Sequence, residues 1–408
     1  MNYIKRDMES LIIKLSNQFP AILITGSRQV GKTTMLKKLM EGMDRTYVSL
    51  DDLTIRNLAK TDPAMFFQIY KTPIFIDEVQ YAPELLTYIK IIIDKNQNAG
   101  DFWLTESQIF RLMHGVSESL AGRIAILNLS SLSQNEIYNK LKNAPFKINF
   151  DTLLTRNKTA KKVATPEMFE RIFKGGMPAV VSGQYKDSNI FYSSYLSTYL
   201  ERDVRELSGT IDSLKFLNFI TAVAARTGCI LNTAEIGRDS DITQVTAKDW
   251  LRILETLGII FYLHPYSNNT LKRTIKAPKL YFYDTGLVSY LAKWSSPETL
   301  ESGAMNGAIL ENYVVSEIIK SYQNDGKEPF IYYYRDKDTK EIDVILESDG
   351  QLSPIEIKKT ANPNKQLIRV FGVLDKGTLG RGKGAVLCMY EDLLPLDKDN
   401  FIVPIWLI

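Results

Sequence analysis

The stretch AILITGSRQVGKTTMLKKLM, residues 21–40, decides the fold of the N-terminal part of this chain. Its apolar run Ala21–Thr25 predicts a buried strand, and the end of the stretch has helical spacing. Between them, GSRQVGKT (26–33) fits the pattern G-x-x-x-x-G-K-[ST], a loop whose backbone N–H groups surround a phosphate. Because Gly26 and Gly31 lack a Cβ atom, the backbone can approach a ligand closely there. The stretch therefore predicts a nucleotide site at the N-terminus of a helix.

Two side chains of this loop have expected tasks. Lys32 would reach the β- and γ-phosphates, and the hydroxyl of Thr33 would hold Mg²⁺. The alternative is a glycine-rich turn that matches the pattern by chance. The residues expected to contact the nucleotide are Gly26, Ser27, Arg28, Gln29, Val30, Gly31, Lys32, Thr33 and Thr34.

A second apolar strand, PIFIDE (73–78), ends in two carboxylates. In a parallel sheet such a strand would end beside the phosphate loop. Asp77 could then hold the water shell of Mg²⁺, and Glu78 could orient or deprotonate the attacking water. A strand that ends in two solvated acids is the alternative. Together the two motifs favour a triphosphate hydrolase of the AAA-like kind.

Further candidates could sense or stabilise the γ-phosphate. The strand Phe102–Thr105 is expected to end near it, where Thr105 or Ser107 could sense it. Arg123 precedes another strand and could stabilise transition-state charge, in cis or from a neighbouring subunit. An arginine solvated at a strand start fits equally well. The expected catalytic residues are Glu78, Lys32 and Arg123.

Composition narrows the class of protein. A chain of 408 residues predicts two or three domains, and 45% hydrophobic with 24% charged residues is typical of a soluble globular protein. The start, MNYIKRDMES, has no apolar core after its charges, and no run approaches the roughly 18 apolar residues of a membrane span. Cys229 and Cys388 suit buried thiols in a reducing cytosol. We therefore expect a cytoplasmic protein without a membrane partner.

The net charge of +3 does not by itself indicate nucleic-acid binding, and His114 and His264 alone do not predict a zinc site. Residues 140–162 are expected to form an exposed polar connector or insertion, with a nucleic-acid contact as the lesser alternative. Residues 191–207 predict a helix. The mixed signs of its charged set could form a self-neutralising surface face; the set is Glu201, Arg202, Asp203, Arg205 and Glu206.

Residues 231–266 have the layout of a helix-turn-helix with a wing. Thr233 is expected to cap a short helix, and Thr243 begins a longer one. The core stripe of that helix is Trp250, Leu251, Leu254 and Leu257. Residues that would face a DNA groove are Gln244, Lys248 and Arg252, and those that would touch phosphates from the wing are Lys272, Arg273, Lys276 and Lys279. A protein-docking surface is an equal alternative.

The C-terminal third carries acids and a lysine in the D…E-x-K order of restriction-like nucleases. Asp343 lies on one expected strand, and Glu356 and Lys358 lie on one face of the next because side chains alternate. Asp343 and Glu356 could share a metal ion while Lys358 positions or activates a water. Glu311 matches the helical acid of such folds. The alternatives are an acid–x–lysine pair at an exposed strand edge and a binding module that keeps the fold without cleavage.

These motifs resemble a family of bacterial and archaeal AAA-like ATPases that carry a C-terminal domain of unknown function. The resemblance rests on GSRQVGKTT, FIDEVQYAPELL and SESLAGRIAIL, and continues through GGMPAVV, YLERDVREL, KLYFYDTGL, LENYVVSEI and EIDVIL. It implies ATP as the nucleotide, a winged-helix segment, a restriction-endonuclease-like end, and contact between the charged 201–206 cluster and the ATPase domain. Glu106 departs from the family, which usually has Thr-Gly-Ser at this strand end, and puts hydrolysis rate or phosphate affinity in doubt.

The sequence thus predicts an α/β protein with an AAA-like P-loop NTPase domain at 1–150, a helical and winged-helix region at 165–295, and a PD-(D/E)xK nuclease-like α/β domain at 300–408. Its expected function is hydrolysis of ATP with Mg²⁺ to drive or switch domains that bind DNA or a partner protein. The alternatives are an ATP-regulated, metal-dependent nuclease and a slow nucleotide switch that binds proteins. The oligomeric state and the preference for ATP over GTP stay open.

Overall fold

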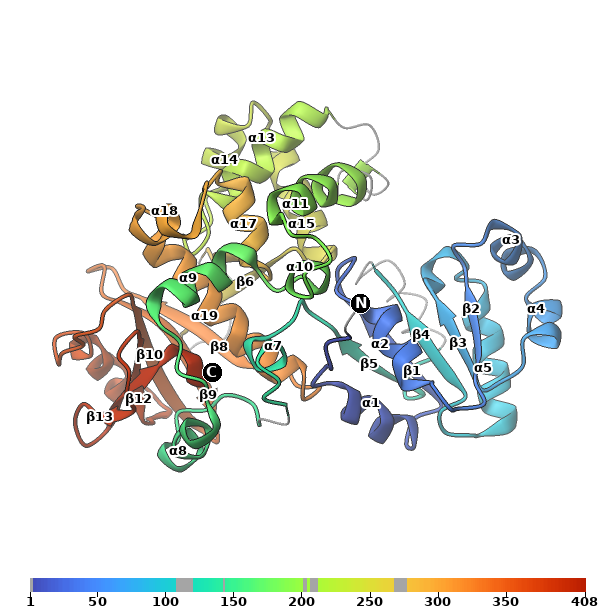
Figure 1. Ribbon diagram of the computed structural model, residues 1–408, viewed down its shortest axis with the longest axis horizontal. Helices are drawn as coiled ribbons and strands as arrows, with labels where there is room; N and C mark the ends of the chain where they lie inside the picture. The colour runs from blue at the N-terminus through green and yellow to red at the C-terminus, as the bar shows by residue number, and fades with distance from the viewer. Residues whose placement is uncertain (1–2, 108–119, 142–143, 201–203, 206–211, 268–276) are drawn as a thin grey trace.

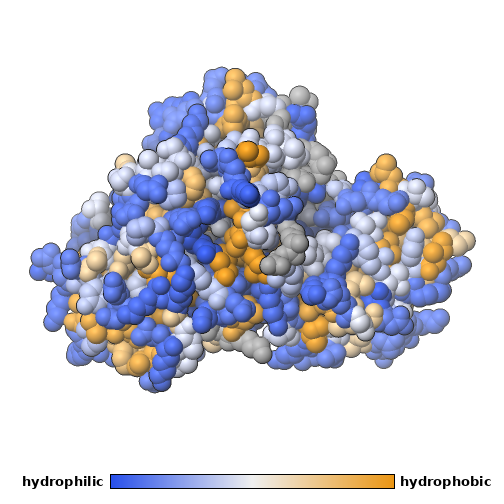
Figure 2. Space-filling view, viewed as in Figure 1, coloured by the Kyte–Doolittle hydropathy of each residue, from blue (hydrophilic) through white to orange (hydrophobic). Residues whose placement is uncertain are grey.

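Two β-sheets and a helical region between them in the sequence organise the chain (Figure 1). The computed structural model describes residues 3–107, 120–141, 144–200, 204–205, 212–267 and 277–408. In Figure 1 the N-terminal sheet lies at the right, the C-terminal sheet at the lower left, and the helices of the middle part above. Figure 2 shows a mostly hydrophilic surface, with hydrophobic residues gathered over the outer helices of the N-terminal part.

The N-terminal sheet is parallel, with strand order β2-β3-β4-β1-β5. Its strands are β1 (Ala21–Thr25), β2 (Thr46–Ser49), β3 (Ile74–Asp77), β4 (Phe102–Thr105) and β5 (Ile124–Asn128). The order puts β4 between the strand of the phosphate loop and the strand of the two acids. All strands run the same way, so the C-terminal ends of β1, β3 and β4 meet at one edge of the sheet.

Helices cover both faces of this sheet. They are α1 (Glu9–Ser16), α2 (Lys32–Leu39), α3 (Leu53–Thr61), α4 (Pro63–Ile69) and α5 (Leu85–Asn96). Side chains alternate along β1, so Ile22 and Ile24 pack with α1 and α2, while Ala21 and Leu23 pack with α3, α4 and α5. Both sets are buried. The continuous apolar run of β1 is therefore the centre of a three-layer domain.

The middle part is helical and ends in a strand hairpin. Its helices are α7 (Gln134–Ile137), α8 (Phe150–Thr159), α9 (Thr165–Lys174), α10 (Pro178–Val181), α11 (Ser188–Tyr195), the π-helical turn η2 (Leu196–Leu200), α13 (Ser213–Ala224), α14 (Thr233–Asp239) and α15 (Gln244–Thr256). The antiparallel strands β6 (Ile260–Pro265) and β7 (Lys279–Phe282) follow. The predicted stripe of α15 is buried, and Thr243 caps that helix as expected. The cap of α14 is Asn232 rather than Thr233.

Two expectations for the middle part change. The described part of residues 140–162, which was expected to be an exposed connector or insertion, contains α8 and buries Phe146, Leu153 and Arg156, so it is partly helical and partly buried. Apolar residues at helical spacing within this polar stretch could have indicated the helix. The expected helix at 191–207 is described as α11 and η2, and of its charged set only Arg205, which is exposed, lies within the described residues.

The C-terminal sheet joins strands from the middle and the end of the chain in the order β13-β14-β12-β10-β9-β8-β6-β7, with β11 paired to β10. Its further strands are β8 (Phe330–Arg335), β9 (Glu341–Ser348), β10 (Gln351–Lys358), β11 (Gly380–Arg381), β12 (Gly384–Cys388), β13 (Leu394–Pro395) and β14 (Asn400–Pro404). Helices α17 (Thr285–Leu291), α18 (Pro297–Ser302) and α19 (Asn306–Gln323) precede them. Because β6 pairs with β8, the middle and C-terminal parts share one sheet.

None of the helices in the described ranges is both long and apolar enough to cross a membrane. Cys388 is buried, as predicted, whereas the thiol of Cys229 is exposed, so the expectation of two buried cysteines is wrong for that residue.

Candidate nucleotide-binding site

The phosphate loop joins β1 to α2 at the edge where the strands end. Gly26 has φ +140°, and a Cβ atom there would lie 2.1 Å from the carbonyl oxygen of Leu129. Gly31 has φ +95° and immediately precedes α2. Both positions therefore require glycine, for close packing at Gly26 and for the left-handed backbone at Gly31.

Lys32 is buried in the loop, with a 5% exposed side chain. Its ammonium donates to the carbonyl oxygens of Gly26 and Ser27, at 2.8 and 2.9 Å. Burial lowers the pKa of Lys32 to about 8, although the carboxylates of Glu78, Asp77 and Glu106 act in the opposite direction. A triphosphate would give this ammonium charged oxygen partners in place of two neutral carbonyls.

Asp77, at the end of β3, is where the loop and the sheet meet. Its Oδ1 accepts a hydrogen bond from the hydroxyl of Thr33 at 2.8 Å and another from Thr105, and its Oδ2 accepts one from Tyr47 at 3.1 Å. The two oxygens expected to hold Mg²⁺, one from each motif, are therefore side by side. Oxygen ligands of this kind are those that Mg²⁺ prefers, so the residues present fit the ion.

Glu78 stands in the left-handed region, with φ +59°. Its backbone N–H donates to Thr105 Oγ1 at 3.0 Å, and its carboxylate accepts from Ser107 at 2.7 Å and from Gln80. Burial raises the pKa of Glu78, but the charge of Lys32 and the hydrogen bonds from Gln80 and Ser107 outweigh it, so the pKa lies below its usual value. The carboxylate is therefore ionised at neutral pH.

The expected sensor strand end is in place. Thr105 bonds to Asp77 and to the backbone of Glu78, and Ser107 bonds to the Glu78 carboxylate. Glu106, between them, is fully buried, and its charge acts on Lys32. A carboxylate at this point adds negative charge beside the phosphate loop.

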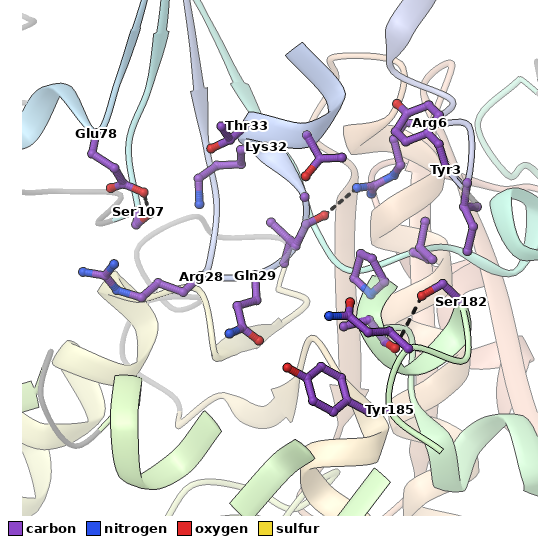
Figure 3. A pocket seen from close by; sticks show the side chains of 18 residues that line it. Tyr3, Arg6, Arg28, Gln29, Lys32, Thr33, Glu78, Ser107, Ser182 and Tyr185 are labelled. Carbon is purple, nitrogen blue, oxygen red and sulfur yellow. Dashed lines mark hydrogen bonds between the residues drawn. The ribbon is translucent and has the colours of Figure 1, made fainter. Parts of the chain in front are cut away.

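A cavity of about 370 Å³ opens in front of these residues (Figure 3). Figure 3 shows Glu78 and Ser107 on one side and Tyr3, Arg6 and Ser182 on the other. The other residues that line the cavity are Ile4, Arg28, Gln29, Val30, Gly31, Lys32, Thr33, Thr34, Leu132, Pro178, Ala179, Gln184 and Tyr185. Its size is that of a small-molecule site, and its wall comes from both the N-terminal domain and α10 with the residues after it.

A buried junction fixes the wall formed by α10. Gly176 donates its N–H to Asp284 at 2.8 Å, and Tyr192 donates its hydroxyl to the same carboxylate at 2.6 Å. A Cβ atom on Gly175 would lie 2.3 Å from that carboxylate, so the chain needs glycine there. The two glycines of the segment GGMP (175–178) thus allow the chain to place Pro178 beside the phosphate loop.

Arg123 is not brought to this site. It directly precedes β5, and Ala21 at the start of β1 donates to its carbonyl, whereas the phosphate loop follows the other end of β1. Four residues of strand separate the two edges, about 13 Å. Its guanidinium pairs with Asp94 at 2.6 Å. A role for Arg123 in cis is therefore wrong, and a role from a neighbouring subunit stays a prediction.

Sequence reasoning missed the N-terminal arm and α10. Tyr3, Arg6, Pro178 and Tyr185 all line the cavity, yet they lie far from the motifs in the chain. Of these residues only Pro178 lies in a string singled out for the family resemblance, GGMPAVV (175–181).

The predicted nuclease-like residues also gather, around two lysines. Lys358 lies 3.2 Å from Asp343 and 2.8 Å from Glu356, and Lys279 lies 2.9 Å from Glu311. Lys279 also pairs with Glu341 at 2.6 Å, and its side chain is only 3% exposed. The expectation that Lys279 touches DNA from a wing is therefore wrong, because it is buried in this acid–lysine cluster. Lys272, Arg273 and Lys276 lie outside the described residues.

Burial and the Asp343 charge raise the pKa of Glu311, and raise that of Glu356 to about 7. Among the described residues, no group of three or more His, Cys, Asp or Glu side chains is arranged to hold a metal ion. Asp343 and Glu356 therefore both contact Lys358 at the point where a shared metal ion was expected. The Thr33–Asp77 pair is a different case, because Mg²⁺ keeps waters and substrate phosphates as most of its ligands.

The predicted DNA-facing side chains of α15, Gln244, Lys248 and Arg252, are all exposed. Val245 beside them is 69% exposed, and Arg252 lies 3.5 Å from Asp249 on the same helix. The face is therefore mixed in charge and partly apolar, which leaves both DNA and protein partners open.

Comparison with known proteins divides the chain into three matches. An AAA domain matches residues 18–138, and two domains of unknown function, DUF8612 and DUF4143, match residues 165–298 and 306–408. Uncharacterized proteins of Mycobacterium tuberculosis and Mycobacterium bovis are each 26% identical over 402 residues, which is 98% of this chain and 83% of theirs.

Similar solved structures include the Walker-type ATPase of Pyrococcus abyssi, with 15% identity and a TM-score of 0.45 over 71% of this chain and 96% of that one. Another is the RuvB Holliday junction branch migration motor of Thermotoga maritima, with 14% identity and a TM-score of 0.32 over 63% of this chain and 89% of that one. The AAA-domain match, the parallel sheet and the phosphate loop support an AAA-like ATPase domain at the N-terminus.

Proposed function

We propose that this protein binds ATP with Mg²⁺ in the cavity beside the phosphate loop and hydrolyses its γ-phosphate. The observation that carries the proposal is the hydrogen bond of 2.8 Å between Thr33 and Asp77, with Lys32 and Glu78 on the same cavity. The two sequence motifs thus meet at one point, with a positive group for the phosphates and a carboxylate for the water.

Each residue has a task in this reaction. Lys32 would exchange its two carbonyl partners for phosphate oxygens, and the loop N–H groups would bind the same oxygens. Glu78, ionised by its surroundings, would orient the attacking water and accept its proton. Thr33 and Asp77 would hold Mg²⁺, which when bound neutralises charge on the β- and γ-oxygens.

The cavity also suggests how hydrolysis reaches the rest of the chain. Pro178, Ala179 and Tyr185 belong to the middle part but line the cavity together with the phosphate loop. A nucleotide that contacts both walls can favour one arrangement of the two parts, because only differential contacts shift such an equilibrium. We propose that the ATP or ADP state changes the posture of the C-terminal parts, which bind DNA or a partner protein.

A slow nucleotide switch is the second candidate. It is favoured by the two hydrogen bonds that Ser107 and Gln80 donate to Glu78, since a carboxylate held in this way must be released before it meets a water. The buried Glu106 favours the same candidate, because its negative charge would weaken the affinity for phosphate.

The experiment is phosphate release from ATP by the full chain, with and without Mg²⁺ and with and without duplex DNA. We expect release that requires Mg²⁺, and acceleration by DNA would favour a DNA partner. Slow release that DNA leaves unchanged would favour the switch. No release under any condition would overturn the proposed hydrolysis.

A metal-dependent nuclease at Asp343 and Glu356 has less support, because Lys358 already contacts both carboxylates. Plasmid cleavage with Mg²⁺ or Mn²⁺, in wild type and Asp343→Ala, tests it. Cleavage by wild type alone would restore the nuclease hypothesis.

A further inference from the structure

Arg6, outside every motif of the sequence, is held against the phosphate loop. Its side chain is buried, with 3% exposure, and lies beside the cavity (Figure 3). Its Nη1 donates to the carbonyl oxygen of Val30 at 2.7 Å, its Nη2 to that of Ser130 at 2.7 Å, and its Nε to the carboxylate of Glu136 at 2.9 Å. Three acceptors on three segments thus fix one guanidinium.

The bond to Val30 sets the direction of one peptide plane. A trans peptide is planar, and its C=O and N–H point to opposite sides. With the Val30 carbonyl bonded to Arg6, the N–H of Gly31 in the same peptide unit points the other way, away from Arg6. Gly31 lines the cavity and has φ +95°, a conformation from which a glycine peptide can flip at little steric cost.

A flipped Val30–Gly31 peptide would present a carbonyl oxygen to the phosphates in place of a donor. That exchange replaces an attraction with a repulsion at the point where the loop binds negative charge. Glu136 supports the arrangement, because it also accepts from the backbone N–H groups of Asp7 and Ser133 and so cannot move with the arginine.

We propose that Arg6 is a positioning residue for nucleotide binding, which locks the Val30–Gly31 peptide in the orientation that binds phosphate. The inference rests on the proposed ATP site and adds to it a residue that acts through the loop backbone. Arginine is required because only its planar fork of donors reaches the three acceptors together.

The test is the affinity of Arg6→Lys and Arg6→Gln for ATP and for inorganic triphosphate in the full chain. Lysine keeps the charge but loses the fork, so we expect both variants to bind both ligands about tenfold more weakly, the loss expected for a hydrogen bond of this kind. The weaker binding of triphosphate, which has no base, would locate the defect in the phosphate loop. Wild-type affinity in Arg6→Lys would overturn the inference, because charge alone would then suffice.

Arg156→Lys is the matched control. Arg156 is also buried and donates to two backbone carbonyls, of Leu407 at 2.9 Å and of Ala144, but its partners are not in the cavity wall. We expect Arg156→Lys to lower the melting temperature while its ATP affinity stays that of wild type. If Arg156→Lys weakens binding as much as Arg6→Lys, the effect is general loosening and the inference fails.

Glu136→Gln keeps an acceptor for Arg6 and serves if the Arg6 variants do not fold. We expect it to weaken triphosphate binding about threefold, because a neutral amide holds the guanidinium less firmly. Unchanged affinity in this variant would count against the inference. If wild type binds no ATP, the proposed function falls together with the inference, whereas ATP binding that Arg6→Lys leaves unchanged removes the inference alone.

Discussion

The chain contains two clusters of acids and lysines that sequence patterns predict, and the structure gives them different surroundings. At the phosphate loop, Lys32 donates to the backbone carbonyls of Gly26 and Ser27 and faces a cavity beside Asp77 and Glu78. In the C-terminal cluster, Lys279 and Lys358 already pair with acidic side chains. The first cluster can exchange its partners for a ligand, whereas the lysines of the second already have charged partners within the protein.

This difference shows what a spacing motif does and does not predict. D…E-x-K spacing correctly brings Asp343, Glu356 and Lys358 together, but it says nothing of Lys279, which comes from a strand about sixty residues earlier. The buried Lys279 pairs with Glu311 and Glu341, and Lys358 pairs with Asp343 and Glu356, so a lysine already stands beside each of these acids. The comparison therefore predicts catalysis at the N-terminal cluster and stability from the C-terminal one.

The largest expected effect is on hydrolysis. Glu78→Gln should lower the rate of phosphate release about 10²–10⁴-fold, because an amide cannot accept the proton of the attacking water. ATP affinity should change little, which a binding titration would show. Glu84→Gln, an exposed acid at the start of α5, is the control and should act like wild type. Equal rates in both variants would remove Glu78 from the mechanism.

Breaking the C-terminal cluster should cost stability but not activity. Lys279→Met leaves the largely buried Glu311 without its cation, and such a loss typically costs about 3–5 kcal/mol. Denaturant unfolding measures it. Lys162→Met, which removes an exposed ion pair with Asp392, should leave the midpoint unchanged. If the folded Lys279→Met protein also stopped hydrolysing ATP, the two clusters would not be independent.

The pH dependence of ATP binding should report on Lys32. Its pKa in the nucleotide-free protein is about 8, and a bound triphosphate raises it by stabilising the charged form. Binding above this pH must therefore take up a proton, so the Kd for ATP should be flat below about pH 7.5 and rise about tenfold per pH unit above the pKa. The melting temperature at each pH is the control. A Kd that stays flat to about pH 9.5 would contradict the lowered pKa.

The smallest expected effect is that of Arg123→Ala. The residue lies at the opposite edge of the sheet from the phosphates, so phosphate release by the monomer should change less than about twofold. Asp94→Ala removes the partner of Arg123 and should behave in the same way. A loss of activity in Arg123→Ala alone, and only at concentrations where the chain self-associates, would indicate an arginine supplied by a neighbour.

The sequence predicted features that depend on neighbours in the chain. The strand, loop and helix at residues 21–40 and the acids after β3 are local patterns, and the structure has them where the sequence predicts. The position of Arg123 could also have been predicted, because a residue that starts a parallel strand lies at the edge opposite to the loop. Arg6 could not, since its acceptors lie 24 to 130 residues away. The pairing of the buried Lys279 with Glu311 could not be predicted either, because the two residues are also far apart in the chain.

Calorimetric titration of the full chain with ATP and Mg²⁺, beside Lys32→Ala, tests the central claim most directly. The account predicts one saturable site in wild type and a Kd about 100-fold higher in Lys32→Ala. The variant lacks the ammonium group, which in wild type would exchange its two carbonyl partners for phosphate oxygens. No binding in wild type, or equal binding in both proteins, would contradict it.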